Sequence, residues 1–182
     1  MDLTALLKHE HGLWAVAPYL RDWLLSFAAS VSESARQDFD PLGRALDVLL
    51  ADDSQEAEKA LELQHVVDQV WYQAQLHDPE CCKNDTFREW LVQRGDMRTR
   101  VHYVIAVIDH IQSAFVSSVT TEIQELRSLR KALLANWRML CDLRQLSDSG
   151  SPEGSATVAA VEDNLLMMFE RATALIRMYE QT

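Results

Sequence analysis

Residues 158–179 read VAAVEDNLLMMFERATALIRMY, and their apolar side chains recur at alternating steps of three and four residues. Because an α-helix completes a turn about every 3.6 residues, this spacing places those side chains along one face. The alternation matches the a and d positions of a coiled coil. We therefore expect a helix whose apolar seam packs against another helix. The seam consists of Val158, Val161, Leu165, Met168, Ala172, Leu175 and Tyr179.

The same helical period runs through the start of the chain. Residues 2–31 predict one long helix with apolar residues at three- and four-residue steps. Pro18 lies inside it and lacks an amide donor, which favours a kink or a break near Ala17. Asp40 followed by Pro41 predicts the start of the next helix, because Asp caps free amides and Pro suits the first helical position.

Two further helices are expected on either side of a loop. Ser54 is a candidate cap for a helix that ends before the loop at residues 77–85. Thr86 and Glu89 have the spacing of a capping box, which predicts a short helix that stops at Gly95.

The helical stripe resumes after Asp96, which is a candidate cap. The Ser- and Thr-rich stretch 117–121 has low helix propensity, so residues 96–147 predict either one very long helix or two. The segment 147–155, SDSGSPEGS, is rich in Gly, Ser and Pro and predicts a flexible linker before the last helix.

Composition agrees with the helical pattern. The 182 residues are 48% hydrophobic and 25% charged, as in a globular protein, and only 5 Gly and 4 Pro are present to make turns. We expect an all-α fold: a single domain over residues 1–182, built as a bundle of about six or seven long amphipathic helices packed antiparallel. The chain has no apolar run long enough for a membrane span and no signal-peptide pattern, which favours the cytoplasm.

The charge is strongly acidic and unevenly distributed. The formal net charge is −11, and residues 1–95 carry 17 acidic against 8 basic side chains. Because such a field repels phosphate groups, we expect no direct binding to nucleic acid and none to an anionic membrane. Arginine outnumbers lysine 13 to 4, a bias typical of GC-rich bacterial genomes.

No catalytic, cofactor or metal motif stands out. His77, Asp78, Cys81 and Cys82 offer zinc-ligand chemistry within one loop, but adjacent cysteines seldom share one tetrahedral ion. The sequence contains one Glu-x-x-His pair, Glu62 with His65, whereas di-iron bundles use such a pair from each of two helices. There is no nucleophile elbow or phosphate-binding loop. We expect no enzyme, no cofactor and no metal ligand.

The remaining signal is apolar surface beyond what the inward stripes require. Aromatic and Met side chains are favoured at protein interfaces, because they fill a partner's pockets. Completing the bundle core is the alternative role for each of these residues. The candidate partner-binding residues are Tyr19, Trp23, Trp71, Tyr72, Met167, Met168 and Met178.

Together these features predict a non-enzymatic bacterial regulator that binds and occludes another protein. The classes that fit are an anti-activator, an anti-sigma-like factor, an immunity protein and a secretion chaperone. The acidic first half would steer a basic patch on the partner, such as that of a transcription regulator. The alternative is a hemerythrin-like bundle that encloses a small ligand or a metal, and the same surplus surface also suits a homodimer.

Overall fold

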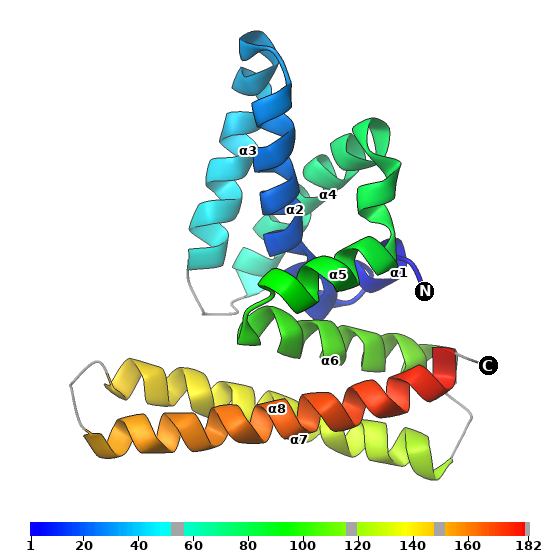
Figure 1. Ribbon diagram of the computed structural model, residues 1–182, viewed down its shortest axis with the longest axis vertical. Helices are drawn as coiled ribbons and strands as arrows, with labels where there is room; N and C mark the ends of the chain where they lie inside the picture. The colour runs from blue at the N-terminus through cyan, green and yellow to red at the C-terminus, as the bar shows by residue number, and fades with distance from the viewer. Residues whose placement is uncertain (52–56, 116–119, 148–151, 181–182) are drawn as a thin grey trace. The chain divides into compact units, whose positions relative to one another are not determined.

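The computed structural model describes residues 1–51, 57–115, 120–147 and 152–180. Within these ranges the chain forms eight α-helices and one 3-10 turn and no β-strand (Figure 1). The prediction of an all-α helical bundle is confirmed, with a helix count slightly above six or seven. The elements are α1 (Leu3–Leu6), α2 (Glu10–Ser30), α3 (Glu33–Ala51), α4 (Ala57–His77), η1 (Pro79–Cys82), α5 (Asn84–Arg94), α6 (Met97–Ala114), α7 (Thr121–Ser147) and α8 (Pro152–Glu180).

The chain divides into two compact units, Met1–Thr99 and Arg100–Thr182. The first contains α1 to α5 and the first residues of α6, and the second contains the rest of α6 with α7 and α8. The single domain over residues 1–182 stays a prediction. None of the helices in the described ranges combines the length and the apolar character that crossing a bilayer requires.

The predicted helix over residues 2–31 is divided, but not near Ala17. The Asp2 carboxylate caps α1 by accepting from the Ala5 amide at 2.9 Å, and α2 begins only at Glu10. Pro18 lies inside α2, so the predicted break at that point is wrong, and the kink that the proline also favours stays a prediction. Burial explains the continuity: the side chains before and after the proline are in the core, and packing outweighs one missing hydrogen bond.

The chain turns between α1 and α2 at a very close backbone approach. A Cβ at Gly12 would lie 1.8 Å from the Leu6 carbonyl oxygen and 2.5 Å from its carbon. Only a residue without a side chain fits there. Leu3 and Leu6 are thereby held at 0% exposure, beside Trp14 in the same core.

The start of α3 also differs from the prediction. The helix begins at Glu33 rather than at Pro41, which lies within it. The Arg36 guanidinium donates to the carbonyl oxygens of Ala28 at 2.7 Å and Ala29 at 3.2 Å, which belong to the last turn of α2. These contacts satisfy carbonyls that a helix end leaves free and anchor the segment before the proline.

The predicted loop at residues 77–85 contains η1, and α5 begins at Asn84, two residues before the expected Thr86. The expected end of α5 is confirmed, because the Gly95 amide donates to the Leu91 carbonyl at 3.0 Å. Asp96 caps α6 as predicted, and its carboxylate accepts from the Thr99 amide at 2.8 Å.

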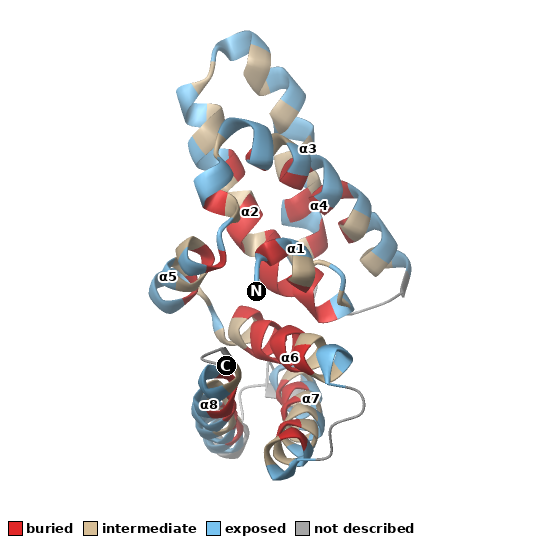
Figure 2. Cartoon of the chain, turned by 90° about the vertical axis from the view of Figure 1, so that its right-hand side faces the viewer, coloured by how far each residue is buried: buried red, intermediate tan, exposed pale blue. Residues whose placement is uncertain are grey.

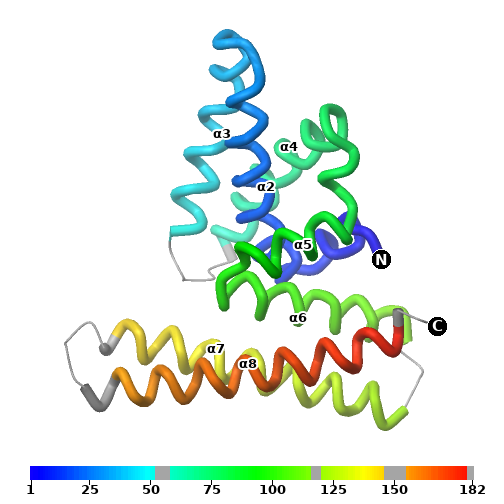
Figure 3. The backbone as a smooth tube through the Cα atoms, in the orientation of Figure 1, coloured from blue at the N-terminus to red at the C-terminus, as the bar shows by residue number. Residues whose placement is uncertain are grey.

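In the described parts of residues 96–147 there are two helices, α6 and α7, and residues 116–119 between them lie outside the described residues. Within the second unit, α7 and α8 lie side by side and run antiparallel (Figure 3). Of the predicted linker 147–155, residue 147 ends α7 and residues 152–155 belong to α8, whereas 148–151 lie outside the described residues. The predicted seam of α8 is confirmed: Val161, Leu165, Ala172 and Leu175 are buried, and Val158, Met168 and Tyr179 are half-buried.

Ion pairs reinforce the hairpin at its surface. Arg144 contacts Glu162 at 2.7 Å, and Arg171 binds both carboxylate oxygens of Glu125 at 2.5 and 2.9 Å. Each pair joins α7 to α8 on the outside of the seam. Exposed pairs of this kind contribute little to stability but fix the register of the helices.

The Arg171–Glu125 pair predicts a measurable titration shift. The pKa of the Glu125 carboxyl is lowered by its hydrogen bonds to Arg171 and by the attraction of the positive charge. The substitution Arg171→Gln should raise the Glu125 pKa toward its ordinary value, measured by NMR titration of the side-chain carboxyl carbon. A lowered folded-state pKa stabilises the fold above the unfolded-state pKa, and this contribution is lost as the pH falls through the folded-state pKa.

Arg144→Gln is the matched control, since it removes the other ion pair of the same hairpin, nineteen residues further along α7. It should leave the Glu125 titration unchanged. An equal shift in both variants, or none in Arg171→Gln, would contradict the assigned pair.

Candidate partner-binding groove

An apolar groove of about 710 Å³ lies between α3 and α4 of the first unit. Val48 and Leu61 form its outer edges, and each is 73% exposed. Leu49 and Val66 lie in the same groove and are 7% and 9% exposed. Exposed aliphatic side chains beside buried ones make a contiguous apolar surface, which on a soluble fold marks a binding site more often than chance. The lining residues are Arg44, Ala45, Val48, Leu49, Leu61, Glu62, His65 and Val66.

Helical periodicity explains why these residues meet. On α3, Ala45 is followed by Val48 and Leu49 at three- and four-residue steps, so the three share a face. On α4, Leu61 and His65 are four residues apart and also share one. Figure 2 shows α3 with α4 beside it in the first unit, and α3 mostly exposed.

The outer face of α4 extends the apolar edge of the groove. Tyr72 is 60% and Leu76 is 61% exposed, and they follow Leu61 by eleven and fifteen residues. Eleven residues are close to three helical turns, so Tyr72 lies on the same face as Leu61. Tyr72, one of the predicted partner-binding residues, is thus placed at a surface where a partner can reach it.

The surroundings of the groove are acidic. The α3 sequence carries four acidic and two basic side chains, and the α4 sequence three acidic and one basic. Arg44, Glu62 and His65 stand at the groove itself. The His65 ring is hydrogen-bonded to the Gln69 side chain at 3.0 Å. Such a field favours a positively charged partner.

Two of the predicted partner-binding residues lie in the core instead. Tyr19 is 6% exposed and Trp71 is 8% exposed. The Tyr19 hydroxyl donates to the Cys81 carbonyl at 2.6 Å, and its ring makes edge contacts with the rings of Phe87 and Trp90 at 5.3 and 5.4 Å. Burial, together with the nearby thiols, raises the pKa of the Tyr19 phenol well above its ordinary value. These aromatics stabilise the first unit.

Trp23 occupies an intermediate position. It is half-buried and stacks on Phe27, with ring centroids 5.0 Å apart and an interplanar angle of 7°. Phe27 in turn meets the rings of Phe39 and His77 at 5.0 and 4.6 Å. This aromatic cluster connects α2, α3 and α4, so Trp23 contributes to the packing of the first unit and does not line the groove.

The three predicted methionines lie on α8 in the second unit. Met167 is 62% and Met178 is 57% exposed, and their eleven-residue separation places them on one face of the helix. Met168 is half-buried on the seam, where its sulfur accepts from the Asn136 side-chain amide at 4.0 Å. No hollow among the described ones is lined by them.

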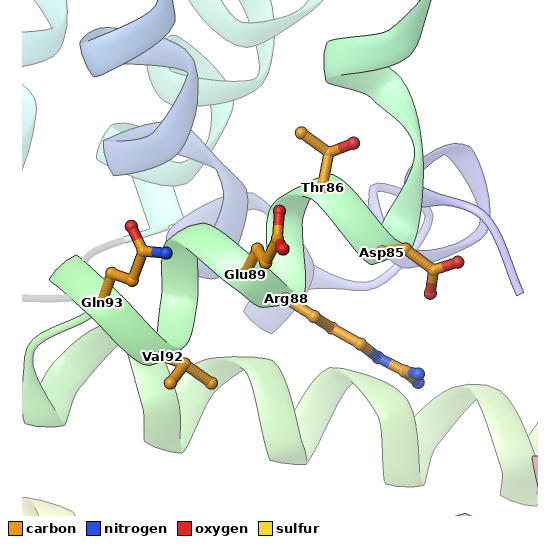
Figure 4. A pocket seen from close by; sticks show the side chains of 6 residues that line it. All are labelled: Asp85, Thr86, Arg88, Glu89, Val92 and Gln93. Carbon is orange, nitrogen blue, oxygen red and sulfur yellow. The ribbon is translucent and has the colours of Figure 1, made fainter.

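Two other hollows lie in the first unit. One, of about 470 Å³, is lined by α5 alone, and its side chains point to different sides, with Glu89 and Gln93 opposite Val92 (Figure 4). The other, of about 350 Å³, has a mixed lining of apolar and charged side chains, and its charged groups pair with one another, as Arg21 does with Asp47 at 2.7 Å. Both are smaller than the groove, and neither has its contiguous apolar surface.

The candidate zinc ligands of the 77–85 loop do not converge. The His77 ring packs on Phe27, and the Asp78 carboxylate accepts from the Glu80 amide at 3.2 Å. In the described parts of the chain, no three His, Cys, Asp or Glu side chains gather in a way that suits a metal ion.

Reasoning from the sequence missed Val48 and Leu61, because it favoured aromatic and Met side chains. The signal was present at Leu61, which lies outside the inward stripe of its helix and yet is apolar. No protein-family model, no curated protein and no solved structure matches the chain.

Proposed function

We propose that the chain is a non-enzymatic, cytoplasmic regulator that binds another protein through the groove between α3 and α4 and occludes the bound surface. The occupant is an amphipathic helix of the partner with an apolar face and basic flanks. The observation that carries the proposal is the exposure of Val48 and Leu61, 73% each, on the two sides of one 710 Å³ hollow.

The energetics suit a helix in a groove. Such helices bind through apolar side chains spaced three and four residues apart. The groove residues on α3 and on α4 have the same spacing, so each wall can contact one row of these side chains. Full burial of a Val or Leu side chain contributes roughly 1.5–3 kcal/mol. Burial of Val48 and Leu61 would together contribute about 3–6 kcal/mol, a large share of the roughly 8 kcal/mol that a micromolar Kd requires. Tyr72 would add aromatic surface.

The acidic surroundings select the partner's charge. The acidic side chains of α3 and α4 would attract the basic flanks of such a helix and speed association, whereas they would repel an acidic helix. A basic amphipathic helix is a common DNA-contacting element, so covering it would block a transcription regulator. Three cysteines without a disulfide, all in described parts of the chain, suit the reducing cytoplasm.

Designed peptides test the groove directly. A fluorescein-labelled amphipathic helix of Leu and Lys, and a second of Leu and Glu, are titrated with the full chain and followed by anisotropy. We expect the basic peptide to bind and the acidic one not to. The double variant Val48→Ser/Leu61→Ser should weaken binding at least about a hundredfold, since two apolar anchors of roughly 1.5 kcal/mol or more each are removed.

Val92→Ser is the matched control, because Val92 is 75% exposed and lies on α5 outside the groove. It should bind the basic peptide like the parent chain, and circular dichroism should show all variants folded. Equal affinity of the double variant and the control, or preference for the acidic peptide, would overturn the proposal.

A further inference from the structure

Cys81 and Cys82 form a pair of adjacent thiols at the end of η1, with their Sγ atoms 3.6 Å apart. We propose that this pair is a chelating site for a trivalent, thiophilic centre that carries two exchangeable groups, with an organoarsenical as the representative ligand. The site is separate from the groove and does not depend on it.

The spacing of the sulfurs suits a bridging atom better than a direct bond. Two sulfurs about 2.3 Å from one pyramidal, trivalent centre, at an angle near 100°, lie about 3.5 Å apart, close to the observed 3.6 Å. A disulfide requires about 2.05 Å between the sulfurs and usually at least 4.4 Å between the Cα atoms. Adjacent Cα atoms across a trans peptide are only about 3.8 Å apart, which opposes direct bonding.

The two thiols differ in access and in reactivity. Cys81 is 3% exposed, whereas Cys82 is half-buried and is the thiol that a ligand meets first. A hydrogen bond from the Cys81 thiol lowers the pKa of Cys82, which favours the nucleophilic thiolate at the accessible position. The same hydrogen bond with Cys82, together with burial, raises the pKa of Cys81.

The backbone beneath the pair is fixed. The Tyr19 hydroxyl donates to the Cys81 carbonyl at 2.6 Å, and the Asp78 carboxylate caps the start of η1. The Lys83 amide closes the turn by donating to the Glu80 carbonyl at 3.1 Å. A rigid backbone holds the second thiol near the first, so the second bond forms within one molecule.

The reaction balances without an oxidant or a reductant. The Cys82 sulfur attacks the arsenic of an arsine oxide, and the Cys81 sulfur attacks the same arsenic afterwards. Two arsenic–sulfur bonds form, and the arsenic–oxygen bond breaks. Both thiol protons leave with the oxygen as one water molecule, and arsenic stays trivalent throughout.

Phenylarsine oxide and intact-mass spectrometry test the site. The full chain carrying Cys141→Ser, which removes the third thiol, is mixed with one equivalent of the reagent. We expect one phenylarsenic adduct per chain, formed with loss of one water and reversed by an excess of a small dithiol. Cys82→Ser in the same background should weaken retention about 10² to 10⁴-fold, because only a single bond remains.

Cys81→Ala provides the second arm, and it should weaken retention as much as Cys82→Ser does. Since Cys81 is buried, circular dichroism checks that the Cys81→Ala variant is folded. If it unfolds, the Cys82→Ser variant still decides the test, because Cys82 is only half-buried. The proposal is overturned if Cys82→Ser retains the reagent like its parent. It is also overturned if the parent takes up none while mild peroxide joins the two thiols in a disulfide.

Discussion

Gly12→Ala should lower the free energy of unfolding by about 3–5 kcal/mol, the range of the most disruptive core substitutions. The added methyl group would lie 1.8 Å from the Leu6 carbonyl oxygen, and the clash is with backbone, which cannot rotate away. The turn between α1 and α2 must open, and Leu3 and Leu6 must leave the core. Chemical denaturation followed by circular dichroism measures the loss.

Gly43→Ala is the control for this experiment, because the nearest atom to its added Cβ is a Leu24 methyl carbon at an ordinary 3.8 Å. It lies inside α3, where Ala is preferred over Gly, and should stabilise the fold by about 0.4–1 kcal/mol. A loss at Gly12 no larger than about 1 kcal/mol would show that the turn is not as tight as described.

The second large effect is expected in the α7–α8 hairpin. Leu165 is 0% exposed at the middle of the seam, and Leu165→Ala should destabilise the fold by about 2–5 kcal/mol through lost burial and a residual cavity. Thermal and urea unfolding measure the change.

Leu166→Ala is the neighbouring control, since Leu166 is 38% exposed on the same helix. Its substitution should cost about 1–1.5 kcal/mol, clearly less than Leu165→Ala, because over a third of the residue already lies in water. Equal losses at the two leucines would contradict the seam register, in which one leucine faces α7 and the next faces outward.

The sequence predicted the helices well where one apolar face is buried. The seam through Leu165 and Leu175 lies where the three-and-four spacing placed it, because the burial of such a stripe determines how a helix rotates. The caps at Gly95 and Asp96 were also predicted correctly, because each acts through a hydrogen bond within four residues along the chain.

Helix starts that depend on distant contacts could not be predicted. The α1–α2 break depends on Gly12 meeting Leu6 across a turn, and a glycine alone does not reveal which backbone approaches it. The start of α3 is fixed by Arg36 binding carbonyls of α2, while the local signal at Pro41 indicated a later start. Tertiary contacts outweighed local propensity at both places.

The candidate site was predicted only in part. Tyr72 was chosen from the sequence and is exposed on the same face of α4 as Leu61, but Tyr19 and Trp71 are buried. A large aromatic side chain suits a core and an interface equally, so composition does not separate the two roles. Exposure separates them, and it also identified Val48 and Leu61, whose side chains carry no special chemistry.

The groove and the net charge of −11 have opposite effects on a concentrated solution of the protein. Exposed aliphatic surface draws copies together, while their shared negative charge keeps them apart. Added salt shortens the range of that repulsion to about 8 Å at physiological ionic strength and leaves the apolar attraction in place. The isolated chain should therefore aggregate least at neutral pH and low ionic strength. With a partner bound in the groove, added salt should no longer promote aggregation.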